Sequence, residues 1–278
     1  MVMPGDSPDV ADEMPRLGLG TYSADDRDQW TENVRTALDV GYRHVDTAQV
    51  YENEEYVGEG IRSSEVDRED VFLATKTMHV DVPDDPADVP EAIDGCLDRL
   101  GVDAVDLLYV HWPSGAYEHE PVLSAFDDAY DEGKARNVGV ANFTPELLDE
   151  AREHLDAPLF ANQVEMHPLL PQEELVEYAQ THDHWLVAYS PLGKGEALDV
   201  PEIQEVAERH DASPAQVCLA WLLDHDNVAA IPKASSREHM EDNLAARELE
   251  LDDDDRELID SIDREYREID PDHGPWNW

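Results

Sequence analysis

The chain has 278 residues, of which 41% are hydrophobic, and its 67 acidic residues against 19 lysines and arginines give a formal net charge of −48 at pH 7. This apolar content supports a large buried core and argues against a disordered chain. Because the acids are spread along the whole sequence, the surface is expected to repel nucleic acids and anionic membranes, so neither is expected as a partner.

The charge also has a consequence for stability. Like charges on one surface repel each other and favour unfolding at low ionic strength. At about 1 M salt the Debye length falls to roughly 3 Å, which screens most of this repulsion. We therefore expect a protein from a salt-rich cytoplasm, with an acidic protein of ordinary cytosol as the alternative.

The N-terminal residues 1–15, MVMPGDSPDVADEMP, have no apolar stretch of the signal-peptide type, and we expect them to form a flexible extension. No apolar run in the chain approaches the length of a membrane span.

Short apolar runs typical of strands then alternate with amphipathic runs typical of helices. Thr144 and Ser213, each followed by proline, are expected to cap helices, as is Asn53, which precedes two acids. The eight expected strands are Leu17–Thr21, His44–Thr47, Val71–Thr75, Val105–Val110, Asn137–Val140, Leu159–Gln163, Leu186–Tyr189 and Val228–Ile231.

This alternation implies right-handed βαβ units and a parallel sheet. Eight such units in this length favour a (β/α)8 TIM barrel, an α/β fold, with one domain over residues 1–278. The segment Gly18-Leu19-Gly20 lacks the third glycine of a GxGxxG motif, so a Rossmann domain is not expected. Val80–Pro90 is expected to be a long loop, and residues 270–278 a C-terminal tail.

Cysteine and histidine spacing indicates no metal site. Cys96 and Cys218 lie far apart, and neither belongs to a CxxC pair. His182 and His184 resemble a metal-binding pair, but they precede the seventh strand and so lie at the face opposite the strand ends.

Four residues with chemical potential follow successive strands. Asp46, Lys76 and His111 end the second, third and fourth strands, and Tyr51 lies on the loop after the second. The C-terminal ends of barrel strands meet at one face, where the active sites of such enzymes collect. These four residues are therefore expected to form one site.

The chemistry of the four residues is mutually consistent. A free phenol has a pKa near 10, and a nearby ammonium group favours its ionised form, so Lys76 is expected to lower the pKa of Tyr51. Asp46 can hold Lys76 charged, and His111 can orient a substrate carbonyl. Such a site suits protonation of an oxygen that gains negative charge, as when hydride adds to a carbonyl.

Each residue also has an ordinary explanation. Asp46 could cap a helix, Tyr51 could be packing, Lys76 could pair with any acid, and His111 could be a core histidine; only their joint placement favours a site. A Schiff-base aldolase using Lys76 is an alternative, but it requires a neutral lysine, which the carboxylate of Asp46 opposes.

The sequence resembles the aldo-keto reductase family over nearly its whole length. The matching segments are GLGTY (18–22), GYRHVDTAQVYENEEYVGEGI (41–61), FLATK (72–76), LLYVHWP (107–113), GVANF (139–143), NQVEMHP (162–168), AYSPLGKG (188–195) and IPKASSREHMEDN (231–243). The resemblance is strongest to the short-loop microbial branch that includes diketogluconate-type reductases. It implies reduction of a small-molecule aldehyde or ketone to an alcohol, with hydride from nicotinamide C4 and a proton from Tyr51. A non-enzymatic cofactor-binding subunit on the same barrel is the alternative.

The resemblance also implies a cofactor site without a Rossmann domain. Tyr189 would stack on the nicotinamide, residues 190–192 would line the pyrophosphate path, Lys194 would close over the cofactor, and residues 233–243 would hold the adenosine end. The implied contacts are Thr21, Asn142, Gln163, Tyr189, Ser190, Pro191, Leu192, Lys194, Lys233, Ala234, Ser235, His239, Asp242 and Asn243.

Three departures bear on cofactor choice. Ala141 and Ala234 stand where the family often has serine, and His239 stands where an arginine normally holds the 2′-phosphate. Imidazole is weakly charged at pH 7 and cannot form the bidentate fork of arginine. With Lys233 present and Arg237 in reach, NADP(H) is favoured and NAD(H) is possible.

For the substrate pocket, Tyr22, Trp112 and Trp276 are expected to form an aromatic wall, with Trp278 beside them; core or tail packing is the alternative. We expect a cytoplasmic monomer.

Overall fold

The computed structural model describes residues 14–22, 29–78, 85–115 and 117–278. Eight parallel strands run through one sheet in sequence order, so each strand pairs with its neighbours along the chain. All eight predicted strands are confirmed, with ends shifted by no more than two residues. They are β1 (Leu19–Gly20), β2 (His44–Asp46), β3 (Phe72–Thr77), β4 (Leu107–Val110), β5 (Val138–Ala141), β6 (Leu159–Glu165), β7 (Trp185–Tyr189) and β8 (Val228–Ala230).

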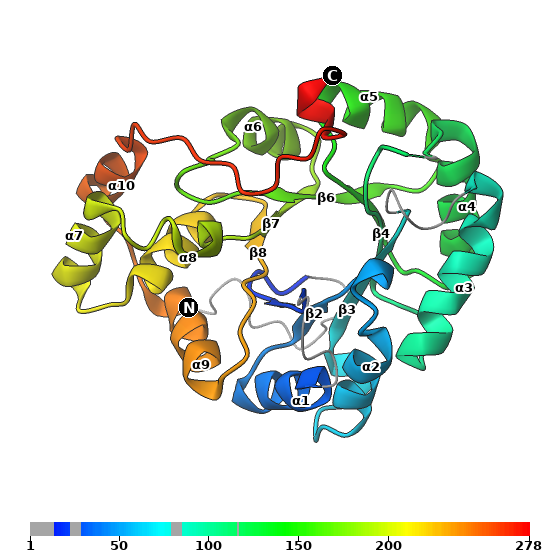
Figure 1. Cartoon of the computed structure of the whole chain (residues 1–278), viewed down its shortest axis with the longest axis horizontal. Coiled ribbons are helices and arrows are strands. Elements are labelled where there is room, and N and C mark those ends of the chain that lie inside the picture. Colours follow the sequence, from blue (N-terminus) through cyan, green and yellow to red (C-terminus); the bar gives the residue numbers. More distant parts are fainter. Residues whose placement is uncertain (1–13, 23–28, 79–84, 116) are drawn as a thin grey trace.

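The sheet closes on itself between its first and last strands. Parallel bridges join Leu17 to Ala230 and Gly20 to Lys233. A Cβ atom on Gly20 would lie 2.5 Å from the carbonyl oxygen of Ile231, so only glycine permits this approach. The strands thus form the predicted barrel, and the helices surround it (Figure 1).

The helices fall between the strands, as the alternating pattern predicts. The α-helices within the described ranges are α1 (Trp30–Val40), α2 (Glu54–Arg62), α3 (Val89–Leu100), α4 (His119–Asp131), α5 (Pro145–His154), α6 (Glu173–Thr181), α7 (Pro201–His210), α8 (Pro214–Asp224), α9 (Arg237–Ala245) and α10 (Asp253–Asp260). None of these helices is long and apolar enough to cross a membrane.

Two of the predicted caps are confirmed. The hydroxyl of Thr144 accepts a hydrogen bond from the backbone N–H of Leu147, and Ser213 forms a capping box with Gln216. The predicted loop Val80–Pro90 is shorter than expected, because α3 begins at Val89; its residues 80–84 lie outside the described ranges.

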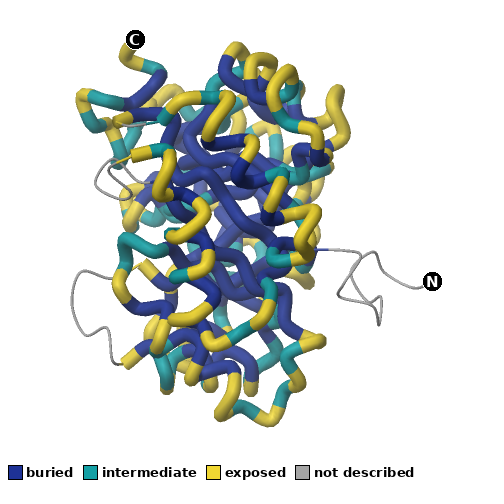
Figure 2. The backbone as a smooth tube through the Cα atoms, turned by 90° about the vertical axis from the view of Figure 1, so that its right-hand side faces the viewer, coloured by how far each residue is buried: buried dark blue, intermediate teal, exposed yellow. Residues whose placement is uncertain are grey.

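Period-two alternation separates an inner from an outer face of the barrel. The inner cluster contains Phe72 and Ala74 of β3 and Leu107 and Tyr109 of β4. The next inward positions toward the C-terminal ends are Lys76 on β3 and, just after β4, His111. The apolar filling of the barrel therefore gives way to polar side chains at one end, while the dark buried strands lie inside a more exposed helical layer (Figure 2).

The prediction of a flexible extension over residues 1–15 is wrong for its last two residues, Met14 and Pro15, which pack against the barrel. Met14 is buried within the inner apolar cluster, and the carbonyl of Pro15 lies 3.1 Å from Nδ1 of His44. Met14 is buried because it packs against the apolar side chains of that cluster, and Pro15 is held by its contact with His44. Residues 1–13 lie outside the described ranges.

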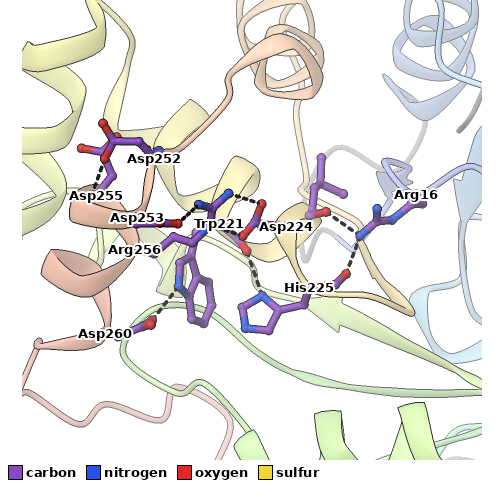
Figure 3. Close-up of polar contacts among 10 residues, drawn as sticks. Arg16, Trp221, Asp224, His225, Asp252, Asp253, Asp255, Arg256 and Asp260 are labelled. Atoms are coloured by element: carbon purple, nitrogen blue, oxygen red, sulfur yellow. Dashed lines mark hydrogen bonds and ion pairs between the residues drawn. The ribbon is translucent and has the colours of Figure 1, made fainter. Parts of the chain in front are cut away.

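The last helix is tied to α8 by polar contacts (Figure 3). Arg256 of α10 donates to both carboxylate oxygens of Asp224, and Trp221 Nε1 donates to Asp260 Oδ1 at 3.0 Å. Nearby, the guanidinium of Arg16 donates to the carbonyls of Leu223, in the last turn of α8, and His225, just past its end, at 2.6 Å each. The start of the barrel and its last helices thus share one contact region.

Candidate active site

A cleft of about 1000 Å³ opens at the C-terminal ends of the strands. It gathers most of the side chains that the sequence singled out, although they come from distant parts of the chain. The predicted site residues that line it are Thr21, Tyr22, Asp46, Tyr51, His111, Trp112, Asn142, Gln163, Tyr189, Ser190, Pro191, Leu192, Lys194 and Lys233.

Lys76 and Asp46 form a buried ion pair, with side chains 0% and 2% exposed. Lys76 Nζ donates to Asp46 Oδ1 and to the carbonyl of Thr47, the latter at 2.8 Å. Gln163 Nε2 donates to the other carboxylate oxygen at 2.8 Å. Burial lowers the pKa of Lys76, and Asp46 opposes this by favouring the charged ammonium. Lys76 does not line the cleft, so it lies behind the reacting surface.

Tyr51 lies between the ion pair and the cleft. It ends a 3₁₀ turn, Gln49–Tyr51, and Lys76 Nζ lies 5.3 Å from the centre of its ring. The His111 ring meets it edge-on at 5.9 Å between centroids. Two predicted catalytic side chains, Lys76 and His111, therefore flank the Tyr51 phenol, and Asp46 holds the lysine.

The predicted lowering of the Tyr51 pKa is wrong. Burial raises the pKa of Tyr51 well above its usual value, and the negative charge of Asp46 raises it further. These two effects outweigh the positive charge of Lys76, which its ion pair with Asp46 partly cancels. Tyr51 is consequently a fully protonated hydroxyl at neutral pH, which is the form that a proton donor needs.

His111 is fixed through its backbone. Its N–H donates to the carbonyl of Thr77 at 2.7 Å, and its carbonyl accepts a hydrogen bond from Asn142 Nδ2 at 3.0 Å. Its side chain is nearly buried and faces the cleft. The histidine is therefore held by the ends of β3 and β5, on either side of its own strand.

The loop that carries Tyr51 is pinned by Asn53. The Thr47 hydroxyl donates to Asn53 Oδ1 at 2.7 Å, and Asn53 Nδ2 donates to the carbonyl of Thr21 at 2.8 Å. Asn53 lies at the predicted N-cap of α2, but its side chain makes no capping bond, so that expected role is wrong. The amide instead closes the loop around Tyr51 and ties it to β1.

Replacing Asn53 with alanine is expected to lower kcat by about 10- to 100-fold, because small displacements of a catalytic group are costly. It should also lower the free energy of unfolding by about 1–3 kcal/mol, since the buried Thr47 hydroxyl loses its acceptor. Asn53→Asp, which keeps an acceptor for Thr47, should retain more stability than Asn53→Ala. Steady-state kinetics and denaturant titrations measure both effects, and wild-type kcat in Asn53→Ala would contradict this role.

Glu54 is a buried carboxylate next to the site that the sequence pattern did not single out. Its Oε1 accepts from the Thr75 hydroxyl at 2.5 Å, and its Oε2 accepts from Arg99 Nε at 2.7 Å. Its charge also favours the ammonium form of Lys76. Glu54 therefore joins the start of α2 to the strand that carries the lysine. In the sequence, Glu54 is one of many acids and lies at a helix start; only its burial in the structure distinguishes it from the surface acids.

The predicted nicotinamide contacts meet at one wall of the cleft. The Tyr189 hydroxyl donates to Asn142 Oδ1 at 2.8 Å, and Gln163 lies one strand away on β6. Asn142 and Ser190 have left-handed backbone angles, with φ of 66° and 46°. Strained backbone of this kind gathers at functional sites, and here the two residues directly follow β5 and β7.

Only one of the residues predicted to hold the adenosine end of the cofactor lines the cleft. Lys233 lines the cleft, whereas Ala234, Ser235, His239, Asp242 and Asn243 do not. Both Asp242 oxygens accept hydrogen bonds from the start of α8, from Ser213 at 2.7 Å and Gln216 at 2.8 Å. Arg237 pairs with Asp39 and Glu241, so it is already occupied by two carboxylates.

The predicted aromatic wall is only partly present. Tyr22 and Trp112 line the cleft, but Trp276 lines a separate cavity of about 350 Å³. The Trp276 ring packs 5.8 Å from that of Trp112 and 4.2 Å from the Arg267 guanidinium. Trp278 is 68% exposed, so it does not contribute a wall. Ile269, the residue just before the tail, also lines the cleft, which the sequence pattern did not indicate.

Within the described ranges, no group of three or more histidine, cysteine, aspartate or glutamate side chains is placed to hold a metal ion.

Comparisons with known proteins agree with this geometry. Residues 16–264 match the model of the Aldo/keto reductase family. Glyoxal reductase of Bacillus subtilis (strain 168) is 37% identical over 255 residues, covering 92% of this chain and 91% of that protein. Methylglyoxal reductase DkgB of Escherichia coli O157:H7 is 37% identical over 261 residues, covering 93% and 96%. The crystal structure of a putative 2,5-diketo-D-gluconic acid reductase B superposes with a TM-score of 0.90 at 32% identity, covering 96% of this chain and 94% of that one. The chain therefore belongs to the aldo/keto reductase family.

Proposed function

We propose that Tyr51 is the proton donor of this enzyme and that Asp46, Lys76 and His111 position the donor and the carbonyl oxygen. As a member of its family, the chain is an oxidoreductase that reduces the carbonyl group of aldehydes or ketones to an alcohol with a nicotinamide cofactor. The observation that supports these roles best is the buried ion pair directly behind the Tyr51 ring.

The proposed roles follow from where charge develops. When the carbonyl carbon gains hydride, its oxygen becomes negative, and the Tyr51 hydroxyl donates a proton to it. The phenolate left behind is stabilised by the ammonium of Lys76, which Asp46 keeps charged in spite of burial. His111, on the cleft side of the phenol, hydrogen-bonds the same oxygen and fixes its direction.

The residues present fit a nicotinamide dinucleotide. Asn142, Gln163 and the ring of Tyr189 offer amide groups and a flat face at one wall, and the cleft volume of about 1000 Å³ accommodates a large ligand. Lys233 lines the far end and has no carboxylate partner among the described residues, which suits an anionic phosphate in this acid-rich chain. When bound, the nicotinamide supplies the hydride from C4.

We propose that NADP(H) is favoured, with limited discrimination against NAD(H). Arg237 is held by Asp39 and Glu241, so Lys233 and His239 remain as the cationic candidates near the 2′-phosphate. A histidine is weakly charged at pH 7 and lacks the fork of arginine, and both properties weaken phosphate binding.

Replacing His239 with arginine is expected to tighten NADPH binding by about 10- to 100-fold while leaving NADH binding unchanged, because only NADPH carries the 2′-phosphate. Quenching of intrinsic fluorescence gives both dissociation constants without turnover. An unchanged ratio of the two constants would place the phosphate away from residue 239.

The function is tested by a screen of carbonyl compounds with NADPH and NADH in concentrated KCl. The panel should include glyoxal and methylglyoxal, the substrates named for two similar reductases. Oxidation of either cofactor with at least one compound is expected. Failure of the whole panel would favour a non-enzymatic cofactor-binding subunit. A Schiff base on Lys76, detectable by borohydride trapping, is not expected because Lys76 does not line the cleft.

We further propose that the protein works in a salt-rich cytoplasm. Its net charge of −48 should make the melting temperature and activity fall as KCl is reduced from about 3 M to roughly 0.1 M. Differential scanning calorimetry across this range measures the effect, and a flat melting temperature would argue against salt adaptation.

We also propose one domain and a monomeric state. A single sheet organises the described elements, and the surface charge opposes association of identical chains. Size-exclusion chromatography with light scattering at high salt measures the mass, and a mass well above 31.3 kDa would contradict the monomer.

A further inference from the structure

The segment after α10 crosses the open end of the barrel and is held there by a buried carboxylate. In Figure 1 it runs from α10 past α6 and β6 toward the C-terminus. The backbone N–H of Glu268 donates to Glu165 Oε1 at 2.7 Å, and that of Ile269 donates to Oε2 at 2.8 Å. Glu165 is the last residue of β6, and its side chain is 0% exposed. We call residues 266–270 the strap.

The strap is also attached on its other side. Glu268 accepts a hydrogen bond from Lys194 Nζ at 2.6 Å, and Lys194 lies in the loop after β7. The Tyr266 hydroxyl donates to the same carboxylate. Both Lys194 and Ile269 line the cleft, so the strap connects β6 to the β7 loop along the edge of the proposed active site.

The Glu165 carboxylate accepts hydrogen bonds mainly from the strap. Among the described residues, its carboxylate has one further hydrogen-bond partner, His167 Nε2 at 3.0 Å. The two strap N–H groups come from more than 100 residues later in the chain. A buried carboxylate is tolerated only when its oxygens are hydrogen-bonded. Removal of the strap would take away the two backbone N–H donors of Glu165 and so destabilise its charged form. Strap and carboxylate therefore stabilise each other.

Glu165 lies on the strand that also supports the ion pair. Two residues earlier on β6, and hence on the same face, Gln163 donates to Asp46. Glu165 pairs in register with Tyr189 of β7, and its charge raises the pKa of the Tyr189 phenol further, in addition to the larger effect of burial. The strap is thus fixed to a strand end that adjoins both the proposed proton donor system and the proposed nicotinamide wall.

We propose that Glu165 is a positioning residue for carbonyl reduction: it fixes the strap, which places Ile269 and, through Glu268, Lys194 against the ligands in the cleft. This inference rests on the proposed function, since it takes the cleft as the place of reaction. Without Glu165, cofactor and substrate binding should weaken more than kcat, because the contacts around Tyr51 remain intact.

The first test is Glu165→Gln, which keeps the shape of the side chain but removes its charge and one acceptor. Hydrogen exchange at the amides of Glu268 and Ile269 should accelerate at least about tenfold, because two charge-assisted bonds are weakened. The dissociation constant of NADPH should rise about tenfold by fluorescence quenching, and KM should rise more for bulky aldehydes than for methylglyoxal.

A matched pair at Glu268 tests the strap without altering the barrel. Glu268→Gln breaks the ion pair with Lys194 but keeps the N–H that donates to Glu165. Glu268→Pro removes that N–H as well. Weaker NADPH binding and faster exchange at Ile269 in the proline variant than in the glutamine variant are expected, and this comparison stands even if Glu165→Gln fails to fold.

Two results would overturn the proposal. Normal exchange of the strap amides in Glu165→Gln, with the proline and glutamine variants alike, would show that Glu165 is not the anchor. Faster exchange with unchanged NADPH binding and unchanged relative KM would show that the strap has no part in the reaction. If the wild-type protein reduced no carbonyl compound, the proposed function would fail instead, whatever the exchange measurements gave.

Discussion

Replacing Tyr51 with phenylalanine is expected to lower kcat for carbonyl reduction by about 10²- to 10⁴-fold, the range that a positioned general acid contributes. The substitution removes the hydroxyl but keeps the ring, whose centre lies 5.3 Å from Lys76 Nζ. The shape of the cleft should persist, so the dissociation constant of NADPH should change little. A loss in kcat with nearly unchanged binding is the signature of an interaction used in the transition state.

Tyr22→Phe provides the matched control. The Tyr22 ring lies 5.2 Å from that of Tyr51, but the residue is 56% exposed at the rim of the cleft. Its hydroxyl is not surrounded by the ion pair and His111, so kcat should stay within about twofold of wild type. If Tyr51→Phe reduced a broad aldehyde panel at the wild-type rate, the proton would have to come from another group.

Replacing Asp46 with asparagine is expected to lower the free energy of unfolding by about 3–5 kcal/mol, because it leaves the buried ammonium of Lys76 without its counter-ion. The carbonyl of Thr47 would be the main remaining oxygen partner. Carbonyl reduction should also fall sharply, since a lysine that loses its charge cannot stabilise a phenolate. Chemical denaturation in concentrated KCl measures the loss.

The dependence of this loss on pH has a definite sign. Burial already lowers the pKa of Lys76 in the folded protein, and removal of Asp46 lowers it further. Between that lowered pKa and the ordinary lysine value near 10.4, the unfolded chain binds more protons than the folded one. The stability of Asp46→Asn should therefore rise with pH across this window. A decline with pH across this window would instead show that the pKa of Lys76 is not lowered in the folded variant.

A double-mutant cycle measures the interaction energy between Asp46 and Lys76 apart from their interactions with other residues. Lys76→Met alone leaves the carboxylate of Asp46 with Gln163 as its remaining side-chain donor among the described residues. In the double variant neither charge is present, so its loss of stability should be clearly smaller than the sum of the two single losses. Purely additive losses would mean that the two charges do not depend on each other.

The fold was predictable because its signals are local and repeated. Leu107–Val110 and Val138–Ala141, for example, are short apolar runs that are followed at once by the polar residues His111 and Asn142. Helix starts at Thr144 and Ser213 carry their own capping chemistry. The end of the predicted extension was misread because the burial of Met14 depends on a surface made by other strands.

The main site residues were predictable because barrel topology brings strand ends together. Asp46, Lys76 and His111 needed only their positions relative to three strands, and the structure gathers them around Tyr51. The acidity of Tyr51 was not predictable in this way. It depends on how much of the lysine charge the carboxylate cancels and on burial, which are both properties of the assembled site.

The supporting residues were hidden for a related reason. Glu54 and Glu165 are two carboxylates among 67 acidic residues, and nothing local marks them as buried. Asn53 resembled a helix cap because its true partners, Thr47 and Thr21, are set by the closed loop and by β1. Asp242 likewise looked available for a ligand, although both its oxygens are used within the protein.

The closure of the barrel by β1 has a consequence for how the chain is made. Arg16, just before β1, donates to the carbonyls of Leu223, His225 and Val228, and its own carbonyl accepts from Ala230. One edge of the first strand pairs with β2, but the other edge finds its partners more than 200 residues later. During synthesis, the N-terminal strands leave the ribosome long before β8 exists. An open parallel sheet with exposed edges must therefore wait for the last quarter of the chain, and in that interval it is most prone to aggregate. Ribosome-bound chains that end before residue 228 should be far more sensitive to protease than chains that extend past it.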